Sequence, residues 1–179
     1  MRRLGAILAG GQATRFGSDK ALAFLEGRAL IAHAAAALDG HVAATIVCGR
    51  DTAPAGMVAI PDWPEPGMGP LGGLCAALRQ ARADGFDAVL SIGCDTPTLP
   101  AALIDRLVAG PGGRFLRQAP IIGCWPVALA DDLERHLAQR GDLAVRRWAA
   151  AAGAAAIDAG GDLPNINSTA DLAAFGGAA

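Results

Sequence analysis

The sequence lacks the long uncharged apolar run that a membrane-spanning helix requires. Hydrophobic residues make up 53% of its 179 residues, and the mean hydropathy is +0.35. Much of this content is alanine, however, and no charge-free run approaches the ~20 residues that cross a bilayer. The apolar stretch Leu4–Ala9 is also shorter than the core of a secretory signal peptide. We therefore expect a soluble, cytoplasmic protein without a membrane partner, folded as one domain over residues 1–179.

A strong positive charge is missing as well. Lysine and arginine together number 15 and aspartate and glutamate 17, so the net charge is −2, and the isoelectric point is about 5.8. Proteins that bind duplex nucleic acid draw their affinity from a field of basic side chains. The balance of charge therefore argues against a nucleic-acid partner, and we expect any phosphate that binds here to belong to a small molecule.

Paired cysteines are also absent. Cys48, Cys75, Cys94 and Cys124 are far apart, form no C-x-x-C pair and lie among apolar residues. This spacing indicates neither a zinc site nor a disulfide framework, and we expect buried reduced thiols. The histidines are equally scattered, and no nucleophile triad or pair of glycosidase carboxylates is evident.

What the sequence does contain is a glycine-rich segment directly after the apolar run Leu4–Ile7. Without side chains at its glycines, main-chain N–H groups can point at an anion. The segment also carries two cations, of which an arginine can fork onto phosphate oxygens while a lysine acts as a mobile point charge. The pattern predicts a phosphate-binding loop between a strand and the next element, formed by Gly10, Gly11, Arg15, Gly17 and Lys20.

Two familiar phosphate loops do not fit these residues. A P-loop needs Gly-Lys followed by Ser or Thr, but Ser18 and Asp19 separate Gly17 from Lys20. The dinucleotide fingerprint G-x-G-x-x-G fails at its second glycine. A third pattern remains, L-A-G-G-x-x-x-R-x-G-x-D-K; the alternative is a structural glycine turn with two solvated cations.

The rest of the chain alternates between strand-like and helix-like segments. Alternation of this kind, without an internal repeat, predicts a three-layer α/β domain on a mostly parallel sheet. One further segment, Ile121–Val127, predicts an antiparallel strand at the edge or in the centre of the sheet, where Pro120 and Pro126 indicate bulges or an edge position. The expected parallel strands are Leu4–Ile7, Val42–Cys48, Val58–Ile60 and Phe86–Gly93, and the expected helices are Ala29–Leu38, Leu71–Ala83, Ala101–Val108, Asp131–Gln139, Asp142–Ala152 and Thr169–Phe175.

Three elements should meet at the carboxyl edge of that sheet. They are the glycine loop, a second loop with the following helix start at Gly67–Gly73, and Asp95 at the end of a buried strand. A carboxylate in that position is well placed to hold a metal ion over the sheet. A cationic phosphate cradle beside one metal-binding carboxylate suits phosphoryl or nucleotidyl transfer without a covalent enzyme intermediate.

Four motifs in order resemble those of the molybdenum cofactor guanylyltransferase (MobA-like) family of nucleotidyltransferases. After the first loop, Gly69–Leu74 resembles the family's G-P-L-A-G, Cys94–Pro97 its C-D-x-P, and Asn165–Leu172 its N-x-N-T-P-E-D-L. The resemblance implies a Rossmann-like nucleotidyltransferase fold with an N-terminal nucleotide-binding part and a C-terminal acceptor-binding part. It also implies transfer of GMP from GTP to the terminal phosphate of molybdopterin, with Mg²⁺ as cofactor and pyrophosphate as the second product.

The resemblance also implies site residues. Leu8, Ala9, Gly10, Lys20 and Asp62 would contact GTP, and Asp95 would bind both Mg²⁺ and nucleotide. We further expect Arg15 and Lys20 to stabilise the negative charge on the departing pyrophosphate. We expect guanine to be recognised by the backbone of Gly69, Pro70, Leu71, Gly72 and Gly73.

The candidates for binding the acceptor are Asn165, Asn167 and Arg146. For the two asparagines the alternative is that they form Asx turns that cap the last helix. For Arg146 the alternative is a position on a solvated helix face.

Some positions depart from the family pattern. Cys48 stands where asparagine is common, Ser168-Thr169 replaces Thr-Pro, and Ala119-Pro120 replaces His-Pro. Two other functions stay open. One is a related transferase that uses CTP or a sugar-phosphate acceptor, and the other is a non-catalytic nucleotide-binding protein in molybdoenzyme maturation. Transient contact with molybdoenzymes or their chaperones would accompany the guanylyltransferase function.

Overall fold

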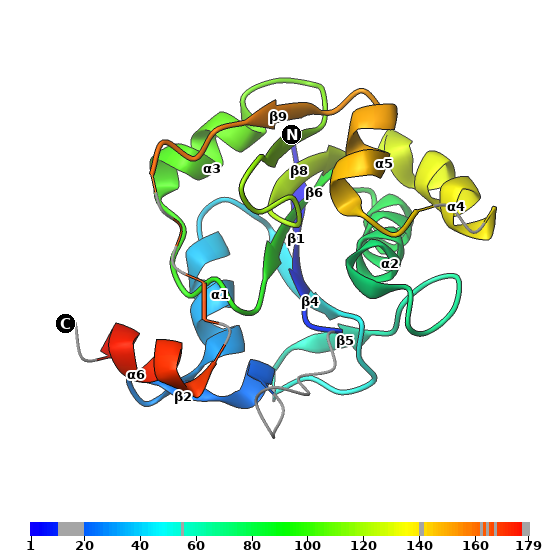
Figure 1. Ribbon diagram of the computed structural model, residues 1–179. Coiled ribbons are helices and arrows are strands. Elements are labelled where there is room, and N and C mark those ends of the chain that lie inside the picture. Colours follow the sequence, from blue (N-terminus) through cyan, green and yellow to red (C-terminus); the bar gives the residue numbers. More distant parts are fainter. Residues whose placement is uncertain are drawn as a thin grey trace.

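The computed structural model describes residues 1–10, 20–54, 56–139, 142–161, 163, 165–166 and 168–176. Its centre is a seven-stranded sheet in the order β5-β4-β1-β6-β8-β7-β9 (Figure 1). These strands are β1 (Arg3–Leu8), β4 (Ala44–Cys48), β5 (Val58–Ile60), β6 (Ala88–Gly93), β7 (Arg114–Leu116), β8 (Gly123–Pro126) and β9 (Ala155–Ile157). A separate hairpin pairs β2 (Phe24–Leu25) with β3 (Arg28–Ala29).

The sheet is mostly parallel, as the alternation of segments predicts. Strand β1 pairs in parallel with both β4 and β6, while β8 runs antiparallel to β6 and β7. The antiparallel direction of β8 is therefore confirmed, and of the two predicted positions the strand takes the interior one. Pro126 is compatible with that place because it occupies the last ladder position, opposite Ala88, where the strand ends.

Helices cover both faces of the sheet and confirm the three-layer architecture (Figure 1). They are α1 (Leu30–Leu38), α2 (Gly69–Ala83), α3 (Ala101–Val108), α4 (Ala130–Ala138), α5 (Val145–Ala151) and α6 (Thr169–Gly176), with short 3-10 turns η1 (Lys20–Leu22) and η2 (Val127–Leu129). Helix α2 begins two residues before the predicted start, and α5 begins three residues after its predicted start.

The alternation of side chains along β1 divides the core. Leu4, Ala6 and Leu8 pack with α2, whereas Ile7 packs with α1 and α3 on the opposite face. Strand β6 is buried along its whole length. Such burial on both faces explains why the central strands read as apolar runs in the sequence.

The polar side chain of Ser91 lies inside this core. Ser91 on β6 is fully buried, and its hydroxyl donates to the carbonyl of Ile121 at 2.6 Å. The same oxygen accepts a 2.8 Å hydrogen bond from the indole Nε1 of Trp125. The Trp125 ring lies 5.3 Å from that of Trp148. Because these groups satisfy one another, their polar atoms can remain buried between β6 and β8.

The cysteines match the sequence prediction in three of four positions. All four are free thiols, and Cys48, Cys75 and Cys124 are buried, while Cys94 is half-buried. Burial raises the pKa of Cys48 and of Cys75 to about 12. Separately, within the described residues none of the helices combines the length and the apolarity that crossing a bilayer requires.

Candidate functional site

The ends of β1, β4, β5 and β6 meet at the carboxyl edge of the sheet and continue into one group of loops. Ala9 N–H donates to the carbonyl of Cys48 at 2.9 Å, and Gly49 N–H donates to Ile60 at 2.9 Å. On the other side of β1, Cys94 N–H donates to Leu8 at 3.3 Å. The start of the first loop and the segment that leads to Asp95 therefore lie at one edge with the ends of β4 and β5, while residues 11–19 of the predicted phosphate loop lie outside the described part of the chain.

Asp62 lies at this edge, just after the outer strand β5. Its Oδ2 accepts a hydrogen bond from the Gly67 N–H at 3.2 Å, whereas its Oδ1 is buried and has no hydrogen-bond partner among the described residues. Glycines surround the carboxyl group: an added Cβ would lie 3.1 Å from Oδ1 at Gly49 and 3.0 Å from Cγ at Gly72. A buried acceptor without a partner is costly in an apoprotein, and it suits a ligand that brings a donor.

Burial raises the pKa of the Asp62 carboxyl above its ordinary value of 3.8, opposed in part by the hydrogen bond from Gly67. Ionisation at neutral pH therefore costs folding free energy. We expect Asp62→Asn to raise the Tm near pH 7, with a gain that shrinks as the pH falls through the raised pKa and vanishes below about 3.8. Calorimetric Tm values from about pH 3 to about pH 8 test this, and parallel profiles of the two proteins would contradict it.

Gly49 allows the first loop to cross the end of β4 in close contact. Its φ is +87°, and an added Cβ would lie 2.6 Å from the Cα of Gly10 and 2.8 Å from its nitrogen. Side chains are rarely compatible with that φ, and this separation leaves no room for a methyl group. The contact between Gly10 and Gly49 therefore joins the start of the predicted phosphate loop to the end of β4, and Gly49 is also close to the Asp62 carboxyl group.

Asp95 follows β6 on the same edge and is half-buried. Its carboxylate folds back over Gly93, where an added Cβ would lie 2.4 Å from Oδ1. The Asp95 carbonyl accepts a 2.9 Å hydrogen bond from Ile166 N–H, which brings the C-terminal motif to this point. The first two residues of that motif thus lie beside the predicted metal ligand.

The carboxylate of Asp95 could hold a divalent metal ion at this edge of the sheet. Within the described residues no three His, Cys, Asp or Glu side chains cluster as a metal site. Mg²⁺ is commonly held by one or two carboxylates together with substrate phosphates and water. Asp95 beside a phosphate loop fits that set of ligands.

Helix α2 begins at the same edge, and no side chain caps its first turn. The side chain of Leu71 is fully buried in the core, and Gly72 packs against Asp62. Among the predicted contacts in this turn, Pro70 is exposed, and Gly69 has φ +60° with no atoms close to its Cβ position. The backbone of this turn, rather than its side chains, is what a ligand would meet.

Other predicted residues lie outside the described part of the chain or have different contacts. The described part of the chain excludes Gly11, Arg15, Asn167 and the side chain of Lys20. The backbone of Lys20 begins η1. The next residue, Ala21, packs in the same apolar cluster as Ile92. Asn165 is exposed. Ser168 caps the last helix, since its hydroxyl accepts a hydrogen bond from the Asp171 N–H at 3.1 Å.

Arg146 on α5 donates to the carbonyl of Arg117 at 2.5 Å. This contact attaches the helix to the segment after β7. The guanidinium therefore has a structural partner, in line with the alternative of a helix-face residue.

The comparison with known sequences gives a consistent result. The profile of the MobA-like NTP transferase domain matches residues 5–157 of this chain. A molybdenum cofactor guanylyltransferase of Acidiphilium cryptum is 39% identical over 176 residues, which cover 93% of this chain and 90% of that protein. The protein of the same name from Rhodobacter capsulatus is 35% identical over 180 residues, which cover 97% of this chain and 94% of that protein.

Solved structures resemble the fold over nearly its whole length. Molybdopterin-guanine dinucleotide biosynthesis protein A from Archaeoglobus fulgidus matches with a TM-score of 0.78 at 21% identity, covering 98% of this chain and 97% of that one. The 2-C-methyl-D-erythritol 4-phosphate cytidylyltransferase of Thermus thermophilus matches with a TM-score of 0.68 at 15% identity, covering 97% of this chain and 96% of that one. At these identities the likeness concerns the fold alone.

Proposed function

Because the chain belongs to the MobA-like NTP transferase family, we propose that it is a molybdenum cofactor guanylyltransferase, which transfers GMP from GTP to the terminal phosphate of molybdopterin. The products are the molybdopterin guanine dinucleotide and pyrophosphate. The observation that carries the proposal is the meeting of Gly10, Gly49, Asp62 and Asp95 at one edge of the sheet. These residues provide a phosphate-loop start, a buried acceptor and a metal-binding carboxylate within one site.

We assign the triphosphate to the first loop and to Asp95. The N–H groups that follow Leu8 would bind phosphate oxygens, with Arg15 and Lys20 neutralising the charge on the departing pyrophosphate. Asp95 would hold Mg²⁺, which lowers the cost of negative charge at the α-phosphate. Gly93 supports this role, because its missing Cβ leaves the Asp95 carboxylate room to lie against the end of β6. Positioning and charge neutralisation then provide most of the rate, and no side chain need form a covalent intermediate.

We assign the base to Asp62 and the first turn of α2. Asp62 Oδ1 is a buried acceptor without a partner among the described residues, and guanine carries adjacent N–H donors on its ring and its exocyclic amine. The uncapped N–H groups of α2 suit the guanine carbonyl oxygen. For the molybdopterin side we keep Asn165, Asn167 and Arg146 as proposals, of which Asn165 has the firmest support because its neighbour Ile166 contacts Asp95.

The decisive experiment is a panel of nucleotides with molybdopterin as acceptor, with pyrophosphate release as the measurement. We expect GTP with Mg²⁺ to exceed CTP by at least about a hundredfold in kcat/KM, since a base that leaves Asp62 unpaired loses the interaction. Faster turnover of CTP would instead favour the cytidylyl alternative. Binding of GTP without pyrophosphate release would favour a non-catalytic maturation partner.

A further inference from the structure

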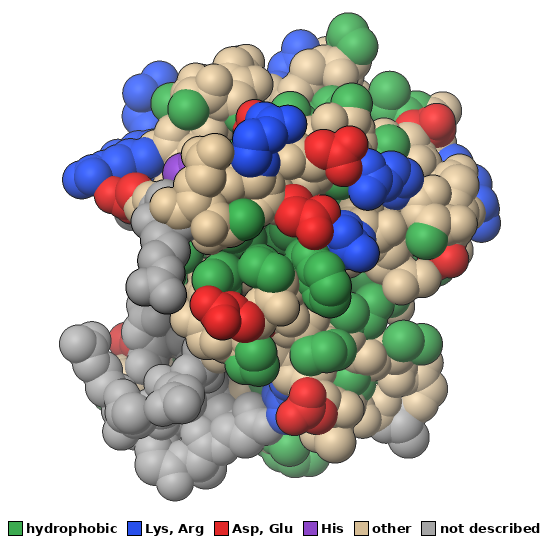
Figure 2. Space-filling model, turned by 90° about the vertical axis from the view of Figure 1, so that its right-hand side faces the viewer, with side chains coloured by type: hydrophobic (Ala, Val, Ile, Leu, Met, Phe, Trp, Pro, Cys, Tyr) green, Lys and Arg blue, Asp and Glu red, His purple; other side chains and the backbone are tan. Residues whose placement is uncertain are grey.

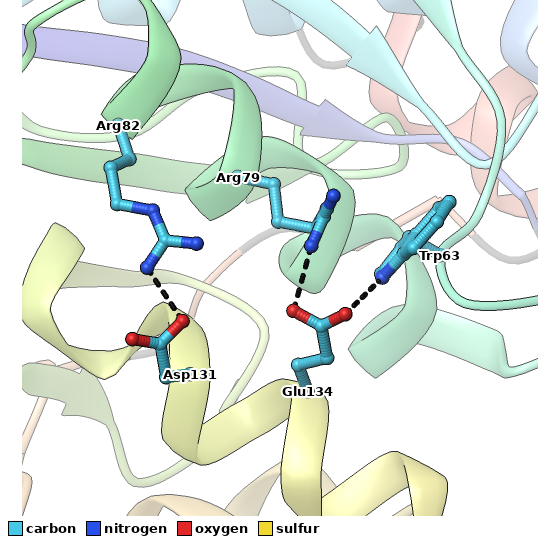
Figure 3. A network of polar contacts seen from close by, with 5 residues as sticks. All are labelled: Trp63, Arg79, Arg82, Asp131 and Glu134. Atoms are coloured by element: carbon cyan, nitrogen blue, oxygen red, sulfur yellow. Dashed lines mark hydrogen bonds and ion pairs between the residues drawn. The ribbon is translucent and has the colours of Figure 1, made fainter.

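The residue after Asp62 is anchored to a helix that lies outside the nucleotide edge. Trp63 donates through its indole Nε1 to Glu134 Oε1 at 2.9 Å (Figure 3). The other carboxylate oxygen of Glu134 accepts from the Arg79 guanidinium at 2.7 Å. The Arg79 guanidinium carbon in turn lies 4.1 Å from the centre of the Trp63 ring. We call these three mutually contacting residues, Trp63, Arg79 and Glu134, the loop clamp.

The loop clamp joins three separate parts of the chain. Trp63 lies in the loop between β5 and α2, Arg79 lies in the third turn of α2, and Glu134 lies on α4. The Trp63 main chain is fixed too, because its N–H donates to the Gly72 carbonyl at 3.2 Å. Figure 2 shows the corresponding face of the molecule, where acidic and basic side chains gather above a band of hydrophobic ones.

The contacts of the loop clamp reinforce one another. The indole hydrogen bond holds the pKa of Glu134 below its ordinary value, and the hydrogen bond and charge of Arg79 act in the same direction. An isolated exposed ion pair contributes little because solvent screens it and both side chains lose freedom. In this cluster one carboxylate fixes both partners, and the guanidinium covers the ring face, so each contact restricts the geometry of the others.

We propose that the loop clamp positions the Asp62 carboxylate for the nucleotide, so that GTP affinity depends on Glu134 of α4 although no clamp residue need touch the ligand. The inference rests on the proposed function. With the indole held on α4, the loop keeps Asp62 against Gly49 and Gly72 with Oδ1 buried. If the indole were released, Asp62 would have to be ordered when the nucleotide binds, and affinity would fall by that cost.

The same pair of helices offers a matched control. Arg82 of α2 donates to Asp131 of α4 at 2.6 Å, one turn away from the Arg79–Glu134 pair (Figure 3). This second ion pair joins the same two helices but has no contact with Trp63 among the described interactions. Loss of the Arg82–Asp131 ion pair should weaken the packing of α4 on α2 about as much as loss of the Arg79–Glu134 pair does. It should leave the position of the Asp62 loop unchanged.

The test compares Glu134→Ala and Trp63→Phe with Asp131→Ala in the full-length protein, with calorimetric GTP affinity and steady-state turnover as readouts. We expect the first two variants to raise the Kd and KM for GTP about fivefold to tenfold, with kcat within twofold of wild type. Asp131→Ala should leave all three constants within twofold. The double variant Trp63→Phe/Glu134→Ala should bind GTP no more weakly than Glu134→Ala alone, because both changes remove the same contact.

Two results would overturn the inference. One is an unchanged GTP affinity in Glu134→Ala, and the other is an equal loss in Asp131→Ala, which would reduce the loop clamp to ordinary helix packing. These results are distinct from failure of the proposed function, in which the wild-type protein itself would neither bind GTP nor release pyrophosphate. Glu134→Gln adds a further check: its amide oxygen can still accept from the indole, so its Kd should fall between those of wild type and Glu134→Ala.

Discussion

Asp95→Ala is expected to lower kcat for guanylyl transfer by about a thousandfold, the largest effect of any single substitution proposed for this protein. Asp95 follows β6 and is the carboxylate that we propose as the metal ligand, and the described residues contain no group of three or more His, Cys, Asp and Glu side chains that could hold the ion elsewhere. Without the Asp95 carboxylate, the Mg²⁺ that we propose to offset negative charge at the reacting phosphate would lose its protein ligand. Initial rates of pyrophosphate release over a range of Mg²⁺ concentrations measure the loss.

The metal dependence distinguishes a lost ligand from a damaged fold. If Asp95 holds the ion, excess Mg²⁺ should recover part of the rate of Asp95→Ala, and the Tm should stay close to that of wild type. Asp105→Ala, on the exposed side of α3, is the control and should retain full activity. A variant at Asp95 that turned over within a few fold of wild type would remove this residue from the proposed mechanism.

Gly49→Ala is expected to weaken GTP binding by about a hundredfold. Its new methyl group would lie 2.6 Å from the Cα of Gly10, where only backbone can move to make room. The first loop must then shift away from the end of β4, and the N–H groups that follow it lose their positions. The methyl group would also lie 3.1 Å from Asp62 Oδ1, the atom that we assign to the base.

Gly56→Ala isolates the part of this effect that comes from backbone conformation. Gly56 has the same φ of +87° as Gly49, but no atom lies within 4 Å of its Cβ position. Both variants should lose about 1–2 kcal/mol of stability from the left-handed conformation of a non-glycine residue, and Gly49→Ala should lose more because its methyl group also meets Gly10. Only Gly49→Ala should lose GTP affinity in calorimetric titrations. Equal affinities in the two variants would show that the contact with Gly10 is unimportant for binding.

Local patterns were sufficient to predict most of the sheet and the position of Asp95. The run that ends at Gly93 is buried on both faces, so it reads as a strand whatever its neighbours are. Strand β7 was not predicted, because Arg114–Leu116 is short and follows a Gly-Pro-Gly-Gly segment typical of a loop. For β8 the sequence left an edge and a central position open, since the choice depends on which strands pair across the sheet.

The site was predicted where a motif marks it and missed where a contact joins distant residues. Asp95 follows a strand and belongs to the Cys94–Pro97 motif, whereas Asp62 follows a strand and was named only through the family resemblance. Gly49 was placed at the carboxyl edge of the sheet by its position after a strand, but it was not assigned to the site. The partnership of Trp63 with Glu134 spans 71 positions of the chain, and no periodicity relates the two residues. Such pairings become visible only when α2 and α4 are packed together.

The uneven burial of the cysteines has a practical consequence for spectroscopy. With pKa values near 12 and no solvent access, Cys48 and Cys75 should resist alkylating reagents until the chain unfolds. Cys94 is less protected and directly precedes Asp95. A fluorophore or spin label should therefore attach there first, which offers a native reporter of nucleotide and metal occupancy without any engineered attachment point.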